Sequence, residues 1–155
     1  MNPNLYSHKF KSAGLRYEVG VHMKLSKIVW INGGVPCGAN SDLGIANSAL
    51  VPILQRANEK AIADGTYRND VFLTKLKRES PTGHVRQFNK LISQVLARHE
   101  TLNRRLKNFS VLSSTFRHGD TLQRRIELHN QCFIAVANLT QLNMCTEPIM
   151  VSRFV

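Results

Sequence analysis

Two acids in this basic chain stand where they could take part in chemistry. Glu100 lies in a segment that is otherwise rich in cations. Those cations are Arg98, Arg104, Arg105, Lys107 and Arg117. Asp64 precedes a glycine directly after the short, small and apolar run of residues 60–63. If that run is a strand, Asp64 lies beyond its carboxyl end, which is where ligands bind in open α/β sheets.

Together, Asp64 and Glu100 supply the oxygen ligands that hard divalent cations such as Mg²⁺ or Mn²⁺ require. A cation held beside basic residues would offset the repulsion between carboxylates and a phosphate backbone, polarise the phosphoryl group and activate water. Each acid also has a simpler explanation. Asp-Gly is a common turn, and Glu100 precedes Arg104 by four residues, a spacing that gives an exposed helical ion pair worth ~0.3 to 0.5 kcal/mol. Both explanations stay open on these residues alone.

The segment around Glu100 has the apolar spacing of an amphipathic helix. Apolar residues recur at steps of three and four over residues 88–109, after a break at residues 79–83 that is rich in turn-forming residues. This spacing predicts one helix. Ile92, Leu96 and Glu100 are four residues apart in series, so they lie along one row of its surface. We therefore expect Glu100 to point from the margin of the buried face towards the body of the domain.

An antiparallel hairpin is predicted near the N-terminus. Residues 15–24 alternate between apolar and polar, which predicts a strand with one buried face and with Glu18 on the polar face. Residues 27–31 are apolar on both sides, as expected of an inner strand. Only two residues separate the runs, so we expect them to pair. Residues 32–34, Asn-Gly-Gly, predict a turn that closes the second strand.

The remaining elements are mostly helical. Ser41 followed by an acid predicts the start of a helix over residues 42–57, with a kink or an early end caused by Pro52. Residues 71–76 predict a short extended or helical piece. The nearly continuous apolar pattern of residues 121–144, which includes Leu122, Leu139 and Leu142, predicts a largely buried helix. The order strand, strand, helix, strand, helix, helix predicts an α/β fold with helices on the faces of a sheet.

Composition indicates the kind of partner. A chain of 155 residues with 43% hydrophobic content suits one globular domain. The 21 Lys and Arg against 10 Asp and Glu give a formal charge of +11, which favours a polyanion, and nucleic acid is the leading candidate. No apolar run approaches the ~20 residues of a spanning helix, and the N-terminus lacks the apolar core of a signal peptide. We therefore expect no membrane partner and an intracellular location.

The cations of the Glu100 segment are the expected nucleic-acid contacts. They are Arg98, Arg104, Arg105, Lys107, Arg117 and His118. Clustered cations bind DNA independently of its sequence, with a log affinity that falls steeply with log salt. The alternative is a scattered, solvated basic face.

Four segments are distinctive together, although each is weak alone. They are YSHKFKSAGLRYEVGVHM, IVWINGGVPCGANSDLGI, AIADGTYR and RHETLNRRLKNFSVLSSTFRHG. These segments, which cover most of the chain, resemble the DDE superfamily endonuclease, the catalytic domain of PIF/Harbinger-like transposases. The resemblance implies a ribonuclease-H-like mixed sheet flanked by helices, a requirement for Mg²⁺ or Mn²⁺, and DNA as the partner. It also implies a nuclear or otherwise intracellular location.

The resemblance assigns roles residue by residue. Asp64 in ADGTY stands at the second catalytic acid of the family, and Glu100 in RHETLNRRLK stands at the third. Asp42 matches a recurrent acid of the family whose role is less defined. One role that the resemblance allows for Asp42 is that of a third metal ligand. The first catalytic Asp of the family lies on a strand upstream of YSHKF, yet residues 1–17 contain no acid. Glu18 belongs to the middle of a matched strand and is no evident substitute.

The expected protein is therefore a single, truncated domain, residues 1–155, that lacks the first strand and the first acid. Three functional classes follow. The first is a metal-dependent endonuclease or transposase domain, which we expect no longer to cut DNA because only two of the three acids remain. The second is a non-catalytic remnant that binds DNA or a protein through its basic surface. The third is a product that folds poorly because its sheet has an unpaired edge. A domain that reads the DNA sequence would lie elsewhere or on a separate protein.

Overall fold

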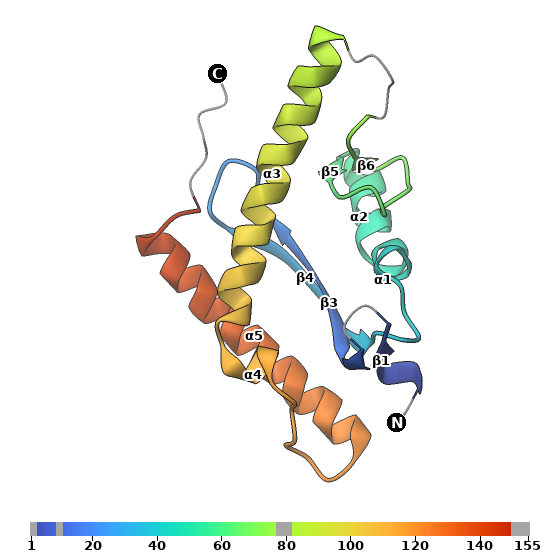
Figure 1. The fold of residues 1–155 in the computed structure, drawn as a ribbon, viewed down its shortest axis with the longest axis vertical. Coiled ribbons are helices and arrows are strands. Elements are labelled where there is room, and N and C mark those ends of the chain that lie inside the picture. The colour runs from blue at the N-terminus through green and yellow to red at the C-terminus, as the bar shows by residue number, and fades with distance from the viewer. Residues whose placement is uncertain (1–2, 9–10, 77–81, 150–155) are drawn as a thin grey trace.

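A two-stranded antiparallel hairpin lies at the centre of the fold (Figure 1). The structure is a computed structural model that describes residues 3–8, 11–76 and 82–149. β3 (Leu15–Val21) pairs with β4 (Ile28–Pro36), which confirms the predicted hairpin. The connection is longer than the two residues that we predicted. In it, Nδ1 of His22 accepts hydrogen bonds at 3.1 Å from the backbone amides of Lys24 and Leu25.

β4 contains bulges where we predicted a closing turn. The turn at residues 32–34 was wrong, because the strand continues to Pro36. Its pairing register shifts beside Gly34, and Gly33 and Gly34 have φ values of +118° and +73°. Glycine adopts such angles without steric cost, and a bulge uses them. The lack of a side chain also matters here, because a Cβ on Gly34 would lie 1.8 Å from Oδ1 of Asn130.

Two shorter strand pairs accompany the hairpin. After a 3-10 turn (Pro3–Leu5), β1 (Tyr6–Ser7) pairs antiparallel with β2 (Ser12–Ala13), and β5 (Ala61–Ile62) pairs parallel with β6 (Phe72–Leu73). β5 confirms the predicted strand at residues 60–63, and β6 shows that residues 71–76 include an extended piece. The α/β class is confirmed. In the described part of the chain, however, the strands form three separate pairs and not one mixed sheet.

The predicted helix at residues 42–57 is divided in two. α1 (Asp42–Ser48) begins after Ser41, whose hydroxyl accepts a hydrogen bond from the Gly44 amide at 3.0 Å, as a helix N-cap does. The helix breaks at Ala49, and α2 (Leu50–Ala57) follows. Pro52 therefore lies in the first turn of α2, where its missing amide proton costs no hydrogen bond.

Two long helices complete the fold and confirm the predicted ones. α3 (Gly83–Lys107) and α5 (Leu122–Thr146) are capped by the hydroxyls of Thr82 and Thr121, and the short α4 (Ser110–Ser113) lies between them. Residues 79–81 of the predicted break fall outside the described residues. Within the described ranges, none of the helices is long and apolar enough to cross a membrane.

Two clusters of buried residues hold these elements together. The first joins α3, α5 and the hairpin through Leu102, Leu106, Phe133, Val136, Ala137, Met144 and Ile149. The second joins α1, α2 and β6 through Ala46, Val51, Leu54, Val71 and Phe72. Tyr17 and Val19 of β3 pack on the first cluster, with the Tyr17 ring stacked 3.7 Å from that of Phe133. The opposite face of β3 therefore turns towards α1.

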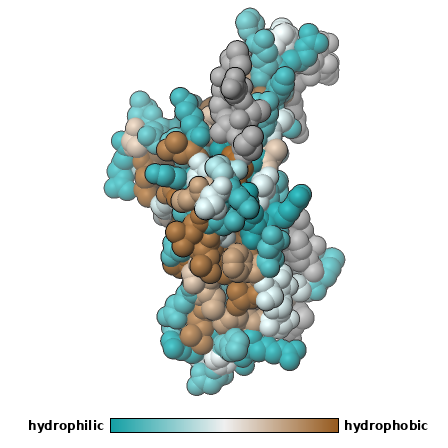
Figure 2. Space-filling view, turned by 90° about the vertical axis from the view of Figure 1, so that its left-hand side faces the viewer, coloured by the Kyte–Doolittle hydropathy of each residue, from teal (hydrophilic) through white to brown (hydrophobic). Residues whose placement is uncertain are grey.

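α5 is less buried than we predicted. Its Leu122, Leu139 and Leu142 are 43%, 52% and 65% exposed. Hydrophobic surface gathers on one face of the molecule in Figure 2. The reason for the error is that residues 128–146 contain no Asp, Glu, Lys or Arg, so hydropathy gives little indication of which side of this helix faces solvent.

Candidate metal centre and nucleic-acid interface

Asp64 lies just beyond the carboxyl end of β5, where the sequence placed it. Its Oδ1 accepts hydrogen bonds from the amide of Thr66, at 2.8 Å, and from the Thr66 hydroxyl. Its carbonyl oxygen accepts one from the amide of Tyr67 at 3.2 Å. The residue is nevertheless exposed. The carboxylate is thus oriented by a tight turn while it remains accessible to a cation.

Glu100 is exposed on α3 and does not point towards the body of the domain. The prediction was wrong because a step of four residues turns a helix by about 40° beyond a full revolution. The row that begins at the fully buried Ile92 passes through the half-buried Leu96 and reaches solvent at Glu100. The alternative ion pair with Arg104 does not form either. The ion pairs found in the described part of the chain join Arg16 to Asp42 and Arg124 to Glu127.

The donor chemistry of Asp64 and Glu100 suits a hard divalent cation, since both carboxylates are exposed and neither forms an ion pair with another described residue. The structure does not gather them into a larger group. Among the described residues, no three His, Cys, Asp or Glu side chains lie close enough together to hold a metal ion. Any cation bound by these two acids would therefore depend on water or on substrate oxygens for its other ligands.

Asp42 is engaged with a cation of the protein itself. It is the first residue of α1, and its Oδ1 lies 3.0 Å from Nη1 of Arg16 on β3. The Asp42 side chain is 54% exposed and that of Arg16 is 24% exposed. A half-exposed pair of this kind contributes little to stability. Its effect is to fix the start of α1 against the face of β3 that is opposite α5.

Glu18 is the acid that sequence reasoning missed. It is only 8% exposed, although we placed it on a polar strand face. Its Oε2 accepts a hydrogen bond from Nε1 of Trp30 at 2.7 Å. Its Oε1 is buried and has no hydrogen-bond partner among the described residues. Burial raises the pKa of Glu18, the hydrogen bond from Trp30 opposes this shift, and the negative charge of Asp42 adds to it.

Tyr67 experiences the charges of three acids. Burial raises the pKa of its hydroxyl above the ordinary range. The negative charges of Asp42, Glu18 and Asp64, in order of decreasing effect, raise this pKa further, and the charge of Arg16 lowers it. The Tyr67 ring also contacts Phe72 of β6, with ring centroids 5.0 Å apart.

β4 is not the inner strand that we predicted from residues 27–31. Among the described residues it pairs with β3 alone, and its Val29 is 60% exposed. The apolar pattern of β4 therefore does not account for the burial of Glu18 on the neighbouring strand.

Arg98 is buried, at 8% exposure, and is a structural residue in this fold. Its guanidinium donates hydrogen bonds to the backbone carbonyl of Met23 and, at 3.5 Å, to that of Ile149. Burial lowers its pKa. The neighbouring His99 contacts another hairpin carbonyl, with Nε2 2.8 Å from the oxygen of Val19. We therefore remove Arg98 from the predicted set of DNA contacts.

The other predicted cations lie at the surface. Arg104, Lys107, Arg117 and His118 are exposed. Arg105 is partly buried and donates to Oδ1 of Asn143 at 2.9 Å and to the carbonyl of Glu147 at 2.6 Å. Arg117 and His118 line a hollow of about 460 Å³ after α4. Three hydroxyl side chains, from Ser110, Ser114 and Thr115, line it as well. Cations beside hydroxyl donors suit phosphate oxygens.

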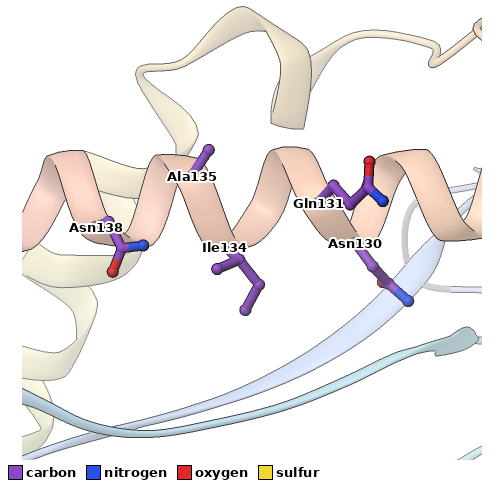
Figure 3. Close-up of a pocket in the computed structure, with 5 residues that line it drawn as sticks. All are labelled: Asn130, Gln131, Ile134, Ala135 and Asn138. Carbon is purple, nitrogen blue, oxygen red and sulfur yellow. The ribbon is translucent and has the colours of Figure 1, made fainter.

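A second hollow, of about 450 Å³, runs along α5 (Figure 3). It is lined by Asn130, Gln131, Ile134, Ala135 and Asn138. These side chains are amides and aliphatic groups, and none of them titrates. The hollow therefore offers neither acid–base chemistry nor the carboxylate ligands of a metal site.

A comparison with protein families matches residues 1–141 to the family described as DDE superfamily endonuclease. The matched range includes the acids and the surface cations discussed above. Comparisons with curated proteins and with solved structures gave no match.

Proposed function

Because the chain belongs to the DDE superfamily of endonucleases, we propose that it is the endonuclease domain of a PIF/Harbinger-like transposase, acting on DNA phosphodiester bonds. The observation that carries the proposal is the match over residues 1–141, which contain both Asp64 and Glu100. The formal charge of +11 supports a polyanionic substrate. An action on chromosomal DNA would place the protein in the nucleus, with a separate protein or region reading the target sequence.

In this proposal Asp64 and Glu100 are the ligands of Mg²⁺ or Mn²⁺. A bound ion of this kind acts as a Lewis acid on the phosphoryl group and activates water. The contribution of the chain is orientation and charge. Thr66 holds one oxygen of Asp64 in place, and within the described ranges Glu100 has no ion pair that would compete for its carboxylate.

We further propose that residues 1–155 form one ribonuclease-H-like domain with impaired catalysis. The hairpin and the β5–β6 pair are not joined, and in the described part of the chain no further strand joins them. Such a strand would complete a mixed sheet. Nor does a third acid join Asp64 and Glu100 among the described residues. Two carboxylates hold Mg²⁺ weakly, so we expect little or no cleavage.

The contact with DNA is proposed for the exposed cations at the C-terminal end of α3 and after α4. They are Arg104, Lys107, Arg117 and His118, with Arg105 at their margin. The hydroxyl-lined hollow beside Arg117 would take one phosphate group. Because these contacts are electrostatic, they are independent of base sequence and sensitive to salt.

Calorimetry with Mn²⁺ tests the metal site. The unmodified protein should bind Mn²⁺ with millimolar affinity, and Asp64→Asn or Glu100→Gln should weaken this binding by about tenfold or more. Asp70→Asn, at another exposed acid near β6, is the matched control and should bind as the unmodified protein does. Equal affinity in all four proteins would refute the Asp64 and Glu100 assignment.

Plasmid cleavage tests the impairment. Supercoiled plasmid with Mg²⁺ or Mn²⁺ should not be nicked above background by the unmodified protein. If it is nicked, and if Asp64→Asn and Glu100→Gln abolish nicking, the domain is active and the impairment is refuted.

The alternative function is that of a non-catalytic remnant that binds DNA or a protein partner through its basic surface. It is favoured by the lack of a three-acid metal group among the described residues. DNA binding that is identical with Mg²⁺ and with EDTA, in a protein that does not bind Mn²⁺, would establish this alternative.

A further inference from the structure

A chain of aromatic contacts runs from the core of the protein to the hollow after α4. Phe133 is only 6% exposed, and its ring stacks on that of Tyr17. The Tyr17 ring also stacks on His129, with centroids 5.6 Å apart, and His129 lies edge-to-face with Phe116 at 5.1 Å. Phe116 in turn lies edge-to-face with His118 at 5.2 Å, a favourable spacing for two rings. The chain of contacts therefore ends at His118, an exposed ring that lines the hollow.

The loop that carries the last two rings is also held by hydrogen bonds. At its start, the Ser114 hydroxyl donates to the carbonyl oxygen of Ser110 at 2.6 Å. At its end, Nε of Arg125 donates to the carbonyl oxygen of Gly119 at 2.8 Å. These bonds and the ring contacts fix the rings before any ligand arrives. A surface that is already ordered loses little conformational freedom on binding.

Two kinds of side chain line this hollow of about 460 Å³. Val111, Phe116 and His118 supply apolar and aromatic surface. Arg117 and Thr115 supply hydrogen-bond donors, and neither side chain has an ion-pair or hydrogen-bond partner among the described residues. A guanidinium beside a hydroxyl suits phosphate oxygens, and an aromatic ring suits the flat face of a nucleobase.

We propose that the hollow binds one unpaired nucleotide of a DNA strand, with its base stacked on the His118 ring and its phosphate at Arg117. Phe116 supports the His118 ring from within and is a positioning residue. In a duplex the neighbouring base pairs cover both faces of a base, so only an unpaired base can stack on a side chain. The volume agrees with this ligand, because it lies within the roughly 300 to 1,000 Å³ of sites that enclose small organic molecules.

This site is separate from the candidate metal ligands. In Figure 1 the loop that joins α4 to α5 lies at the bottom of the molecule, far from β5, which Asp64 follows. A nucleotide in the hollow is therefore not the one whose phosphodiester bond would lie at Asp64. The inference rests on the proposed function, because it takes DNA as the partner. It adds to that function a contact with single-stranded DNA that recognises a base and not only phosphate charge.

Two DNAs of equal charge isolate the contribution of the base. One is a duplex with a short single-stranded tail, and the other is the same duplex with an abasic tail. Fluorescence anisotropy measures the affinity of the full chain for each. The unmodified protein should bind the tail that carries bases about tenfold more tightly, which is the scale expected for one base stacked on one aromatic side chain.

Substitutions of His118 separate stacking from charge, and its exposure means that they leave the core intact. His118→Phe keeps a ring and should keep the preference for the tail that carries bases. His118→Lys keeps a cation without the ring and should lose the preference, as should His118→Ala. His84→Ala is the matched control, because His84 is exposed at the other end of α3, and its preference should equal that of the unmodified protein.

Equal affinity of the unmodified protein for the two tails overturns the inference, as does a preference that persists in His118→Ala or His118→Lys. A ribonucleotide tail that binds more tightly than the DNA tail would assign the hollow to RNA and also overturns it. Salt-dependent binding to blunt duplex DNA is measured in parallel. If that binding is present without a tail preference, the inference fails and the proposed function stands. If the tail preference is present but calorimetry detects no Mn²⁺ binding, the metal assignment fails and the inference stands.

Discussion

Replacing Gly34 by alanine should loosen the contact between α5 and the hairpin. The backbone of Gly34 has a φ of +73°, and an L-residue in left-handed backbone costs roughly 1 to 2 kcal/mol. The new Cβ would also lie 1.8 Å from Oδ1 of Asn130, so that side chain must move. It would then lose its 2.6 Å hydrogen bond from the Tyr17 hydroxyl, worth about 1 kcal/mol. The free energy of unfolding should fall by about 2 to 3 kcal/mol.

Urea unfolding followed by Trp30 fluorescence measures this loss as a fall in the midpoint of about 1 M. Gly65→Ala is the control, because no heavy atom lies within 4 Å of a Cβ there, and its midpoint should stay nearly unchanged. The double variant Gly34→Ala/Asn130→Ala separates the two causes. It should recover the steric part, since the atoms that clash belong to the Asn130 amide. If Gly34→Ala unfolds at the midpoint of the unmodified protein, the close packing of α5 on β4 is refuted.

Four further predictions concern single side chains. Arg98→Met should lower the free energy of unfolding by about 1 to 3 kcal/mol and leave the salt dependence of DNA binding unchanged. Arg104→Ala should instead reduce the slope of log affinity against log salt by ~0.9 without affecting urea unfolding. The reverse pattern would contradict both assignments. Burial raises the pKa of Glu18 above its ordinary value of 4.5, so the stability that Glu18 contributes is fully present below that pH and is lost as pH rises through the folded-state pKa. Glu18→Gln, measured in EDTA, should therefore match the unmodified protein at pH 4 and exceed its stability at pH 8, and parallel curves would contradict this. Tyr17→Phe should lower the free energy of unfolding by about 1 to 3 kcal/mol, because it removes the hydroxyl that contacts His129 and Asn130 and keeps the stacked ring. An unchanged urea midpoint would show that these hydrogen bonds contribute nothing to stability.

The elements with a strong local pattern were predictable from the sequence. Alternation identified β3, and apolar spacing identified α3, because both periodicities reflect a single buried face. Residues 60–63 were predictable as a strand because a short apolar run is followed there by an Asp-Gly turn. The helix at residues 42–57 was also correct in type, although its break came at Ala49 and not beside Pro52.

The errors arose where tertiary structure decides the outcome. The exposure of Glu100 arises because each step of four residues along α3 turns about 40° beyond a full revolution. Our prediction treated residues four apart as if they faced the same direction. The burial of Glu18 on β3 depends on α1, and the burial of Arg98 on α3 depends on the hairpin connection. Neither partner belongs to the strand or helix that contains the buried residue. Gly33 and Gly34 have turn chemistry, but their left-handed backbone serves a bulge beneath α5. Except for Glu100, these positions are set by partners that are distant in sequence.

The contacts between the hairpin and α5 also impose an order on folding. Tyr17 and His129 are 112 residues apart, and the backbone amide of Ile28 donates to Gln141 across 113 residues. A ribosome that adds ~5 to 20 residues per second needs roughly 6 to 22 s to make the chain between Tyr17 and His129. During that interval the hairpin has emerged, while the helix that covers the Tyr17 face does not yet exist. The nascent chain therefore carries an uncovered apolar strand face for seconds, and during synthesis this face is open to aggregation or to binding by a chaperone.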